Sequence, residues 1–389
     1  MRKGWEYKKL GEVATFINGD RGKNYPSAKD FVESGVPFIN AGHLNNGIIR
    51  YDKMNYITIN KYNSLGSGKI IKNDILFCLR GSLGKYAIVA EDSMGAIASS
   101  LVIIRPFQNA DNRFIAHFLS SAKIKEYIAK NNNGSSQPNL SAKSVASFII
   151  PLPTLSTQLA IVSELDKINE LIRLKKEQLK DFDNLAQSLF FEMFGDPVEN
   201  EKGWEVKKLG EICEVVTGTT PKTNIPEYWG KGHYWVTPAE LNDTAVYIDR
   251  TEREITEEAL SKTKLRLLPV GTVLLSSRAP IGKVAITKVE MYCNQGFKNC
   301  ICSDSICNKY LFYFLRMMKE YLNSLGRGAT FKEISKSIVE SIRIPLPPLS
   351  LQQLFAQRIE QIEREKSEVQ KSIQDFETLL ASRMQYWFE

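Results

Sequence analysis

The stretch GWEYKKLGEV at residues 4–13 returns almost unchanged as GWEVKKLGEI at residues 203–212. Eight of the ten positions are identical, and the second copy begins just past the midpoint of a chain of 389 residues. A chain of this length exceeds what one ordinary core accommodates, so two or more domains are expected. The repeated opening predicts that these domains are two copies of one unit.

Two further pairs of motifs extend the repeat along the chain. The segment NDILFCLRGSLGKYAIV (73–89) matches GTVLLSSRAPIGKVAIT (271–287), and FIIPLPTLSTQ (148–158) matches IRIPLPPLSLQ (342–352). Two large copies do not make a solenoid, because solenoids stack several small repeats. The pattern predicts instead a pseudo-two-fold chain that resembles a fused symmetric dimer.

A long helical segment follows each proline-rich junction. Proline suits a helix start. The apolar residues after it recur in alternating steps of four and three, which is the spacing of a coiled-coil seam. Three of the seam positions are basic, namely Lys175, Lys366 and Arg383. The apolar seam positions are Ile161, Leu165, Ile168, Ile172, Leu179, Phe182, Leu189, Phe355, Ile359, Ile362, Val369, Ile373, Phe376 and Leu380.

Two arrangements of these helices are open. Each helix could pack on its own globular domain, or the two could pair with each other, and the pseudo-dyad would then make them antiparallel. We favour the pair, because the apolar stripe of a long helix without a partner would stay exposed to solvent. Gly195 and Pro197 end the first helix. The expected parts are a domain at 1–153, a helix at 154–197, a domain at 198–347 and a helix at 348–389.

The fold class expected is α+β, with two α/β domains joined by the helix pair. Runs rich in β-branched and apolar residues predict strands. Apolar runs with helical spacing predict one helix in each domain. The strands are expected at 36–40, 74–79, 86–90 and 101–106, and the helices at 112–130 and 308–325.

Composition restricts the class of protein. The net charge is +7, and the basic excess lies mainly in the first 150 residues, which permits contact with a polyanion without proving it. An apolar run long enough for a membrane span is absent, and the N-terminus lacks the apolar stretch of a secretory signal. Six cysteines without regular spacing fit a reducing compartment, so the expected location is the cytoplasm.

Motifs of catalysis are missing. GSLGK (81–85) has two residues between its glycines, where a Walker loop has four, and Tyr86 follows its lysine, so a tight turn between strands is the better interpretation. The cluster of Cys293, Cys300, Cys302 and Cys307 lacks the paired spacing of a zinc site and predicts buried thiols. Three scattered histidines, and no convincing methyltransferase or nuclease motif, leave no catalytic centre of the chain's own.

Polar and basic loops offer a different chemistry. Arginine reads guanine edges, Asn and Gln read adenine, and Lys, Ser and Thr hold phosphates. Any one such loop could be ordinary solvated surface, but two copies of the set favour contact with DNA. The candidate residues are Arg21, Lys23, Arg80, Lys85, Ser135, Ser136, Gln137, Asn139, Thr219, Thr220, Lys222, Arg278, Lys283, Asn294, Gln295, Arg327, Thr330 and Lys332.

The ordered combination of motifs resembles the specificity (S) subunits of type I restriction-modification systems. The likeness rests on the paired openings, the IPLP-x-LS-x-Q junctions, both heptad helices and FFEMFGDP (190–197), and it spans nearly the whole chain. GSSQPNLS (134–141) also resembles the family's loop before the first junction. The second half has GRGATFKEIS (326–335) at that place, which departs from the family's pattern.

The resemblance implies a function in host defence. Each domain would recognise one half of a bipartite, asymmetric target in double-stranded DNA, and the helix pair would fix the gap. Two modification subunits would dock on the helices and bring S-adenosylmethionine and the methylating site. Restriction subunits would bring ATP, Mg and cleavage. The chain itself would bind no cofactor or metal, contact no membrane and catalyse nothing.

Three alternatives stay open. The chain could be an S-like subunit of another restriction class, which only its partners would reveal. It could be a coiled-coil scaffold that binds protein and shows no DNA preference. It could also be a stand-alone enzyme on nucleic acid, which activity of the single purified chain would show.

Overall fold

The computed structural model of the chain describes residue 2 and residues 4–45, 47–131, 139–242, 245–278, 280–326 and 332–389. The chain forms two compact units, Met1–Lys175 with Ser372–Glu389, and Lys176–Lys371. Both long helices, α5 (Leu155–Phe194) and α11 (Leu349–Phe388), contribute a segment to each unit. The boundaries between these units fall inside the two long helices and therefore do not test the domain ranges expected from the sequence. Those ranges stay a prediction.

The first unit is built on a four-stranded antiparallel sheet in the order β2-β11-β8-β9. Both faces of this sheet are covered, so successive residues of β8 enter different cores. Ile75 and Phe77 pack toward helix α2, whereas Leu76 and Cys78 pack toward a second sheet in the order β10-β4-β7-β3. The bounds are β2 (Ala14–Asn18), β3 (Phe31–Val32), β4 (Val36–Ile39), β7 (Asn55–Ile57), β8 (Ile75–Cys78), β9 (Tyr86–Ile88), β10 (Ala96–Ile97), β11 (Leu101–Pro106) and α2 (Asn112–Ser120).

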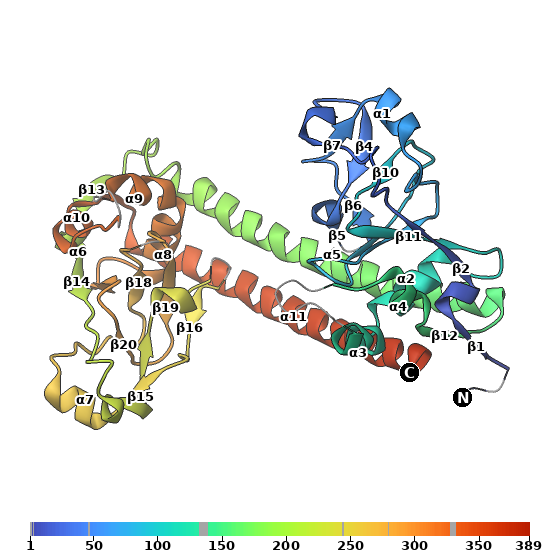
Figure 1. Cartoon of the computed structure of the whole chain (residues 1–389). Coiled ribbons are helices and arrows are strands. Elements are labelled where there is room, and N and C mark those ends of the chain that lie inside the picture. The colour runs from blue at the N-terminus through green and yellow to red at the C-terminus, as the bar shows by residue number, and fades with distance from the viewer. Residues whose placement is uncertain are drawn as a thin grey trace. The chain divides into compact units, whose positions relative to one another are not determined.

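The second unit repeats this plan. Its main sheet has the order β14-β21-β18-β19-β16, and α8 lies beside it (Figure 1). Val273 and Leu275 of β18 share a core with residues of α8. Leu274 packs on the opposite face, beside a three-stranded sheet in the order β17-β15-β20. The bounds are β14 (Cys213–Thr217), β15 (Trp229–Val236), β16 (Tyr247–Ile248), β17 (Glu254–Ile255), β18 (Val273–Leu275), β19 (Val284–Thr287), β20 (Tyr292–Cys293), β21 (Lys298–Cys302) and α8 (Asn308–Met317).

The repeated opening and the repeated junction pair with each other. Strand β1 (Glu6–Lys9) is antiparallel to β12 (Ile149–Leu152), with Tyr7 opposite Pro151. Strand β13 (Glu205–Lys208) is antiparallel to β22 (Arg343–Leu346), with Val206 opposite Pro345. The two motifs that define the repeat therefore form one two-stranded ribbon in each unit, immediately before each long helix.

The remaining elements are short. In the first unit they are β5 (Leu44–Asn45), β6 (Ile48–Ile49), α1 (Ile59–Ser64), α3 (Ala122–Asn131), α4 (Ala142–Ala146) and the 3-10 helices η1 (Leu10–Glu12), η2 (Ala28–Asp30) and η3 (Ala41–His43). In the second unit they are α6 (Leu209–Ile212), α7 (Glu257–Lys262), α9 (Lys319–Leu325), α10 (Lys336–Ser341), η4 (Pro226–Tyr228) and η5 (Pro238–Glu240).

The expectation of one continuous helix in each domain is wrong. The helix expected at 112–130 is divided into α2 and α3 at Ser121, whose backbone is extended and whose hydroxyl accepts a hydrogen bond from the Ile124 amide. The helix expected at 308–325 is divided into α8 and α9 at Met318, whose backbone leaves the helical region. Hydrophobic spacing alone does not reveal such breaks, because the apolar face continues across them.

The two long helices are antiparallel neighbours, as the fused-dimer pattern predicts. In the first unit, Arg383 and Trp387 of α11 donate hydrogen bonds to Glu164 of α5. In the second unit, the ring centroid of Phe355 of α11 lies 5.7 Å from that of Phe190 of α5. Early residues of one helix therefore meet late residues of the other in both units.

All seventeen of the predicted heptad positions are buried or half-buried, including the three basic ones. Lys366 is buried in the seam, and its ammonium lies 2.9 Å from Asp183 and 3.1 Å from Glu363. A polar seam residue with fixed partners specifies helix register at some cost in stability. In the described part of the chain, no helix combines the length and the apolar character needed to cross a bilayer.

Candidate DNA-recognition surface

The candidate loops of the first unit meet at one end of its main sheet. The strand register places the last residues of β2 and β8, Asn18 and Cys78, beside the first residues of β11 and β9, Leu101 and Tyr86. The loops that leave this end carry the expected DNA contacts Arg21, Lys23, Arg80 and Lys85, all of which are exposed. The fold thus gathers residues from separate parts of the sequence at one end of the sheet.

The loop after β2 is held in place by its own polar groups. Arg21 donates a hydrogen bond from Nη2 to the carbonyl of Ser99, at 3.3 Å. The Asp20 carboxylate accepts hydrogen bonds from the backbone amides of Gly22 and Gly66, both at 2.8 Å. These backbone hydrogen bonds hold the pKa of Asp20 below its ordinary value, so the carboxylate stays charged and the loop stays anchored.

Arg80 lies beside the segment that precedes the first junction. Arg80 and Asn139 form an isolated antiparallel bridge, and the Leu140 amide donates to the Leu79 carbonyl at 2.9 Å. Asn139 is exposed, like Arg80. The other expected contacts of this loop, Ser135, Ser136 and Gln137, lie outside the described residues.

The second unit gathers its candidates at the equivalent end. Thr217 of β14 pairs with Lys298 of β21, and Leu275 of β18 pairs with Val284 of β19. The adjoining loops carry the expected contacts Thr219, Thr220, Lys222, Arg278, Lys283, Asn294 and Gln295. Lys332 is exposed next to the same end, whereas Arg327 and Thr330 lie outside the described residues.

Two tryptophans fix the loop after β14. The indole N–H of Trp235 donates to the Thr219 carbonyl at 3.1 Å, and that of Trp229 donates to the Lys222 carbonyl at 3.2 Å. The guanidinium of Arg253 lies 3.6 Å from the centroid of the Trp229 ring. Sequence reasoning missed these supporting residues, because nothing in their spacing links them to a loop they contact only in the fold.

Two neighbouring loops are also tied to each other. Thr220 Oγ1 donates a hydrogen bond to Gln295 Oε1. Asn294 Oδ1 accepts a hydrogen bond from the Gly296 amide at 2.9 Å. The amide side chains of Asn294 and Gln295, which are expected to read bases, are therefore already positioned by hydrogen bonds within the unit.

The equivalent lysines of the two turns have different surroundings. Lys85 is exposed, whereas Lys283 is half-buried and donates a hydrogen bond to the Leu241 carbonyl at 2.6 Å. A phosphate contact by Lys283 would have to compete with that bond. Arg278 also differs from its counterpart Arg80, because it forms an ion pair with Glu333 at 3.1 Å.

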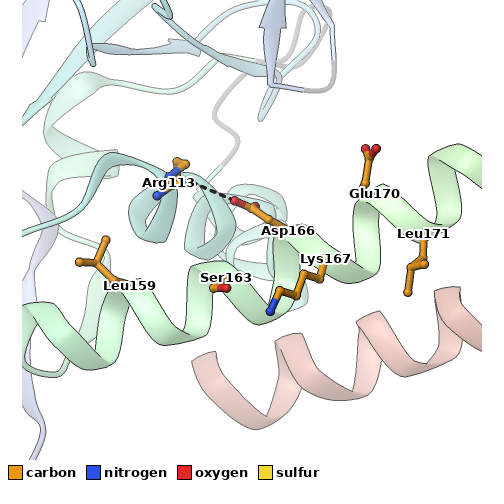
Figure 2. A pocket seen from close by; sticks show the side chains of 7 residues that line it. All are labelled: Arg113, Leu159, Ser163, Asp166, Lys167, Glu170 and Leu171. Carbon is orange, nitrogen blue, oxygen red and sulfur yellow. Dashed lines mark hydrogen bonds and ion pairs between the residues drawn. The ribbon is translucent and has the colours of Figure 1, made fainter.

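A second type of surface lies where a domain helix meets the long helix α5. In the first unit a hollow of about 700 Å³ is lined by Arg113 of α2 and by residues of α5 (Figure 2). Figure 2 shows Arg113 directed at Asp166, to which it is bonded at 3.3 Å. Leu159 and Leu171 at this hollow are each more than 40% exposed, which leaves apolar surface on a face rich in charge.

The ion pairs at this hollow have counterparts in the second unit. His117 Nε2 lies 2.8 Å from Asp166 Oδ1, and this hydrogen bond lowers the pKa of Asp166 below its ordinary value. In the second unit Lys309 of α8 is bonded to Glu360 of α11. The repeat therefore places ion pairs between a domain helix and a long helix in both units.

The cysteines are placed as thiols. Cys78, Cys213, Cys293 and Cys300 are buried, whereas Cys302 and Cys307 are half-buried, so the prediction of buried thiols is confirmed for two of the four clustered cysteines and wrong for the other two. Burial raises the pKa of Cys293 to about 12. A thiol with so high a pKa stays protonated and is a poor metal ligand. Among the described residues, no group of His, Cys, Asp and Glu side chains is arranged to hold a metal ion.

Comparisons with known proteins identify the fold. A curated relative, the type I restriction enzyme MjaIX specificity subunit of Methanocaldococcus jannaschii, is 46% identical over 158 residues, which cover 40% of this chain and 37% of the relative. The putative type I restriction enzyme MjaX specificity subunit of the same organism is 25% identical over 97% of this chain and 92% of its own length.

A solved chain has the same architecture. It comes from a structure that concerns complex assembly and conformational transition of the type I R-M system, and it is similar with a TM-score of 0.67 at 22% identity, over 100% of this chain and 98% of that one. The family described as the type I restriction modification DNA specificity domain matches residues 2–181 and again residues 201–375. These two matches cover most of both repeats, and the chain therefore belongs to the type I restriction modification DNA specificity family.

Proposed function

We propose that this chain is the DNA-recognition subunit of a type I restriction-modification complex and that each unit reads one half of a bipartite, asymmetric target. The observation that carries the proposal is that equivalent ends of the two main sheets present different side chains. Arg21 and Lys23 follow β2, whereas Thr219, Thr220 and Lys222 follow β14. Two similar frames with different loops would read two different half-sites.

Affinity and specificity would come from different groups. Exposed Lys85 and Lys23 would neutralise phosphates, which supplies sequence-independent binding that weakens as salt rises. Arg80, Arg278 and the amides of Asn294 and Gln295 would contact base edges, where a bidentate contact discriminates by about 1–3 kcal/mol. The hydrogen bonds that hold these loops support this assignment, because a pre-positioned side chain loses less entropy on binding.

The long helices would bind the partner subunits. Exposed Leu159 and Leu171 beside charged groups support a protein contact on α5, since interfaces combine apolar anchors with a polar rim. We propose that two modification subunits dock on the helices and bring S-adenosylmethionine, and that restriction subunits bring ATP and Mg. In this proposal the chain binds no cofactor, catalyses no step and acts in the cytoplasm, where its DNA is.

The proposal is tested by expressing the chain with its modification subunits and mapping methylated bases across a genome. We expect one split motif with two dissimilar halves. In the Arg80→Ala variant we expect the half read by the first unit to relax while the other half is kept. A protein-binding scaffold would instead give no sequence preference in the assembled complex, and that outcome would refute the proposed function.

A further inference from the structure

Asn139 and Glu333 occupy the same place in the two repeats. Arg80 forms an isolated bridge with Asn139, and Arg278 forms one with Glu333. The next amide in each case donates to the residue before the arginine, from Leu140 to Leu79 at 2.9 Å and from Ile334 to Ser277 at 3.0 Å. A neutral amide therefore lies beside the first arginine, and a carboxylate lies beside the second.

The carboxylate of Glu333 is shared between two cations. Its Oε2 lies 3.1 Å from Arg278 Nε, and its Oε1 lies 3.3 Å from Lys298 Nζ. The Lys298 ammonium also lies 3.3 Å from the Ser277 hydroxyl. The bridging position restricts Glu333 to one orientation, and this orientation fixes the Nε side of the Arg278 guanidinium.

Burial makes this arrangement durable. The Lys298 side chain is only 6% exposed, and a buried ammonium is unfavourable without a counter-charge. Glu333 therefore stays with Lys298 even when another group approaches Arg278. The Arg278 side chain is 48% exposed, so a large part of it remains accessible to a ligand.

The first repeat has no equivalent of the contact between Lys298 and Glu333. The strand registers Asn18 opposite Val102 and Thr217 opposite Lys298 place Val102 where the second repeat has Lys298. Val102 is fully buried and apolar, so no cation in the first unit braces a carboxylate at this position. The two equivalent arginines are thus prepared for different contacts.

We propose that Glu333, braced by Lys298, is a positioning residue that prepares Arg278 for a guanine edge and repels phosphate from it. A phosphate carries a full negative charge and is repelled by a nearby carboxylate, whereas the O6 and N7 acceptors of guanine carry only partial charges. A guanidinium held in a fixed plane also suits bidentate contact with guanine. This inference rests on the proposed DNA-recognition function and adds a division of roles between its two units.

The test measures binding by the chain assembled with its modification subunits, using fluorescence anisotropy across a range of salt concentrations. The probes are the mapped target duplex, duplexes with one base pair changed in the second half-site, and an unrelated duplex. For Glu333→Gln we expect discrimination at one base pair of that half-site to fall by about five-fold or more. We expect tighter binding to the unrelated duplex, with a salt slope steeper by about 0.9, the value for one more phosphate contact.

A loss of discrimination together with tighter binding to the unrelated duplex separates this role from a structural one. A structural defect would weaken binding to the target and to the unrelated duplex together. The matched control is Glu214→Gln, because Glu214 lies in β14 of the same sheet and forms an exposed ion pair with Arg266. This substitution should change neither quantity. In an Arg278→Ala background, Glu333→Gln should have no further effect on discrimination, because Glu333 acts through Arg278. If Glu333→Gln destabilises the unit by leaving Lys298 unpaired, the double variant with Lys298→Met removes that charge and should give the same two changes.

Two failures are distinguishable. A wild-type complex without sequence preference would refute the proposed function itself. A wild-type complex with a clear target, together with Glu333 variants that keep their discrimination or lose both affinities equally, would overturn only the role of Glu333.

Discussion

Gln158 Oε1 accepts a hydrogen bond from the backbone amide of Asp111, at 2.9 Å, and so joins the start of α5 to the start of α2. The Gln158 side chain is fully buried, and its Nε2 donates to the carbonyls of Asn109 and Pro153. In the second unit Gln352 accepts from the Cys307 amide at 2.8 Å and donates to the Pro347 carbonyl. The final glutamine of each repeated junction therefore anchors a long helix to its domain.

We predict that Gln158→Ala destabilises the first unit by about 1–3 kcal/mol, because it leaves buried backbone groups without partners. Gln352→Ala should do the same in the second unit. The measurement is urea denaturation, with hydrogen exchange to locate the loss at α2 or at α8. Gln353→Ala is the matched control, because Gln353 is exposed and adjacent to Gln352. Equal midpoints for Gln352→Ala and Gln353→Ala would contradict the anchoring role.

Phe388, near the end of α11, is inserted into the core of the first unit. Its ring centroid lies 5.3 Å from that of Phe114 and 5.9 Å from that of Phe118, and it is 1% exposed. We expect Phe388→Ala to cost about 3–5 kcal/mol, since truncation of a buried phenylalanine leaves a cavity. Hydrogen exchange should show faster exchange of the α2 amides. Leu379→Ala, at a position 44% exposed on the same helix, should have little effect, and an unprotected α2 in that control would count against the assignment.

Lys366 is one of three basic residues in a mostly apolar seam, and it is the one that is buried. Replacing a buried ion pair by a well-packed apolar residue is often neutral or stabilising, whereas removing one partner alone is destabilising. The Lys366 ammonium is the buried member of the pair, whereas the Asp183 side chain is 29% exposed and its carboxylate also lies 3.8 Å from Arg316, so the carboxylate keeps solvent and a counter-charge when the lysine is removed. We therefore predict that Lys366→Met changes the free energy of unfolding little or raises it, while Asp183→Ala, which takes a partner from the buried ammonium, lowers it. Urea denaturation of both variants, followed by circular dichroism, is the measurement. A loss above about 2 kcal/mol for Lys366→Met would show that the lysine itself stabilises the helix pair.

The His117–Asp166 contact predicts a pH dependence. The hydrogen bond from His117 lowers the pKa of Asp166 in the folded chain, so its contribution to stability is present above the unfolded pKa of about 3.9 and is lost as pH falls through the lower folded value. Asp166→Asn should therefore be less stable than the wild type near pH 6, and the difference should shrink below about pH 4. Urea midpoints between pH 6 and pH 3 measure this. Asp181→Asn, at an exposed position of α5, is the control, and a gap that widens on acidification would contradict the prediction.

Local pattern was sufficient for much of the fold. The alternation of four and three residues after each junction predicts α5 and α11, and both are helices of 40 residues. The strand expected at 101–106 is β11. These elements follow from the periodicity of apolar side chains, which depends only on residues that are close together in the sequence.

The candidate surface could be predicted only in part. Basic and amide-rich loops such as the one with Arg80 are visible in the sequence, but their convergence depends on the strand register of the two main sheets. The supporting roles of Trp229 and Trp235 could not be predicted, because each contacts a loop distant from it in sequence.

The sequence by itself determined that the chain is a duplication, that a heptad helix follows each half, and that the polar loops of the halves differ. Repetition and periodicity are properties of order along a chain, so no coordinates are needed to recognise them. Only the tertiary structure decided that Glu333 lies between Arg278 and Lys298, while Asn139 lies beside Arg80. Such contacts join strands and loops far apart in sequence, and the stabilising charge pairs depend on which side chains the packed sheets bring within a few ångströms.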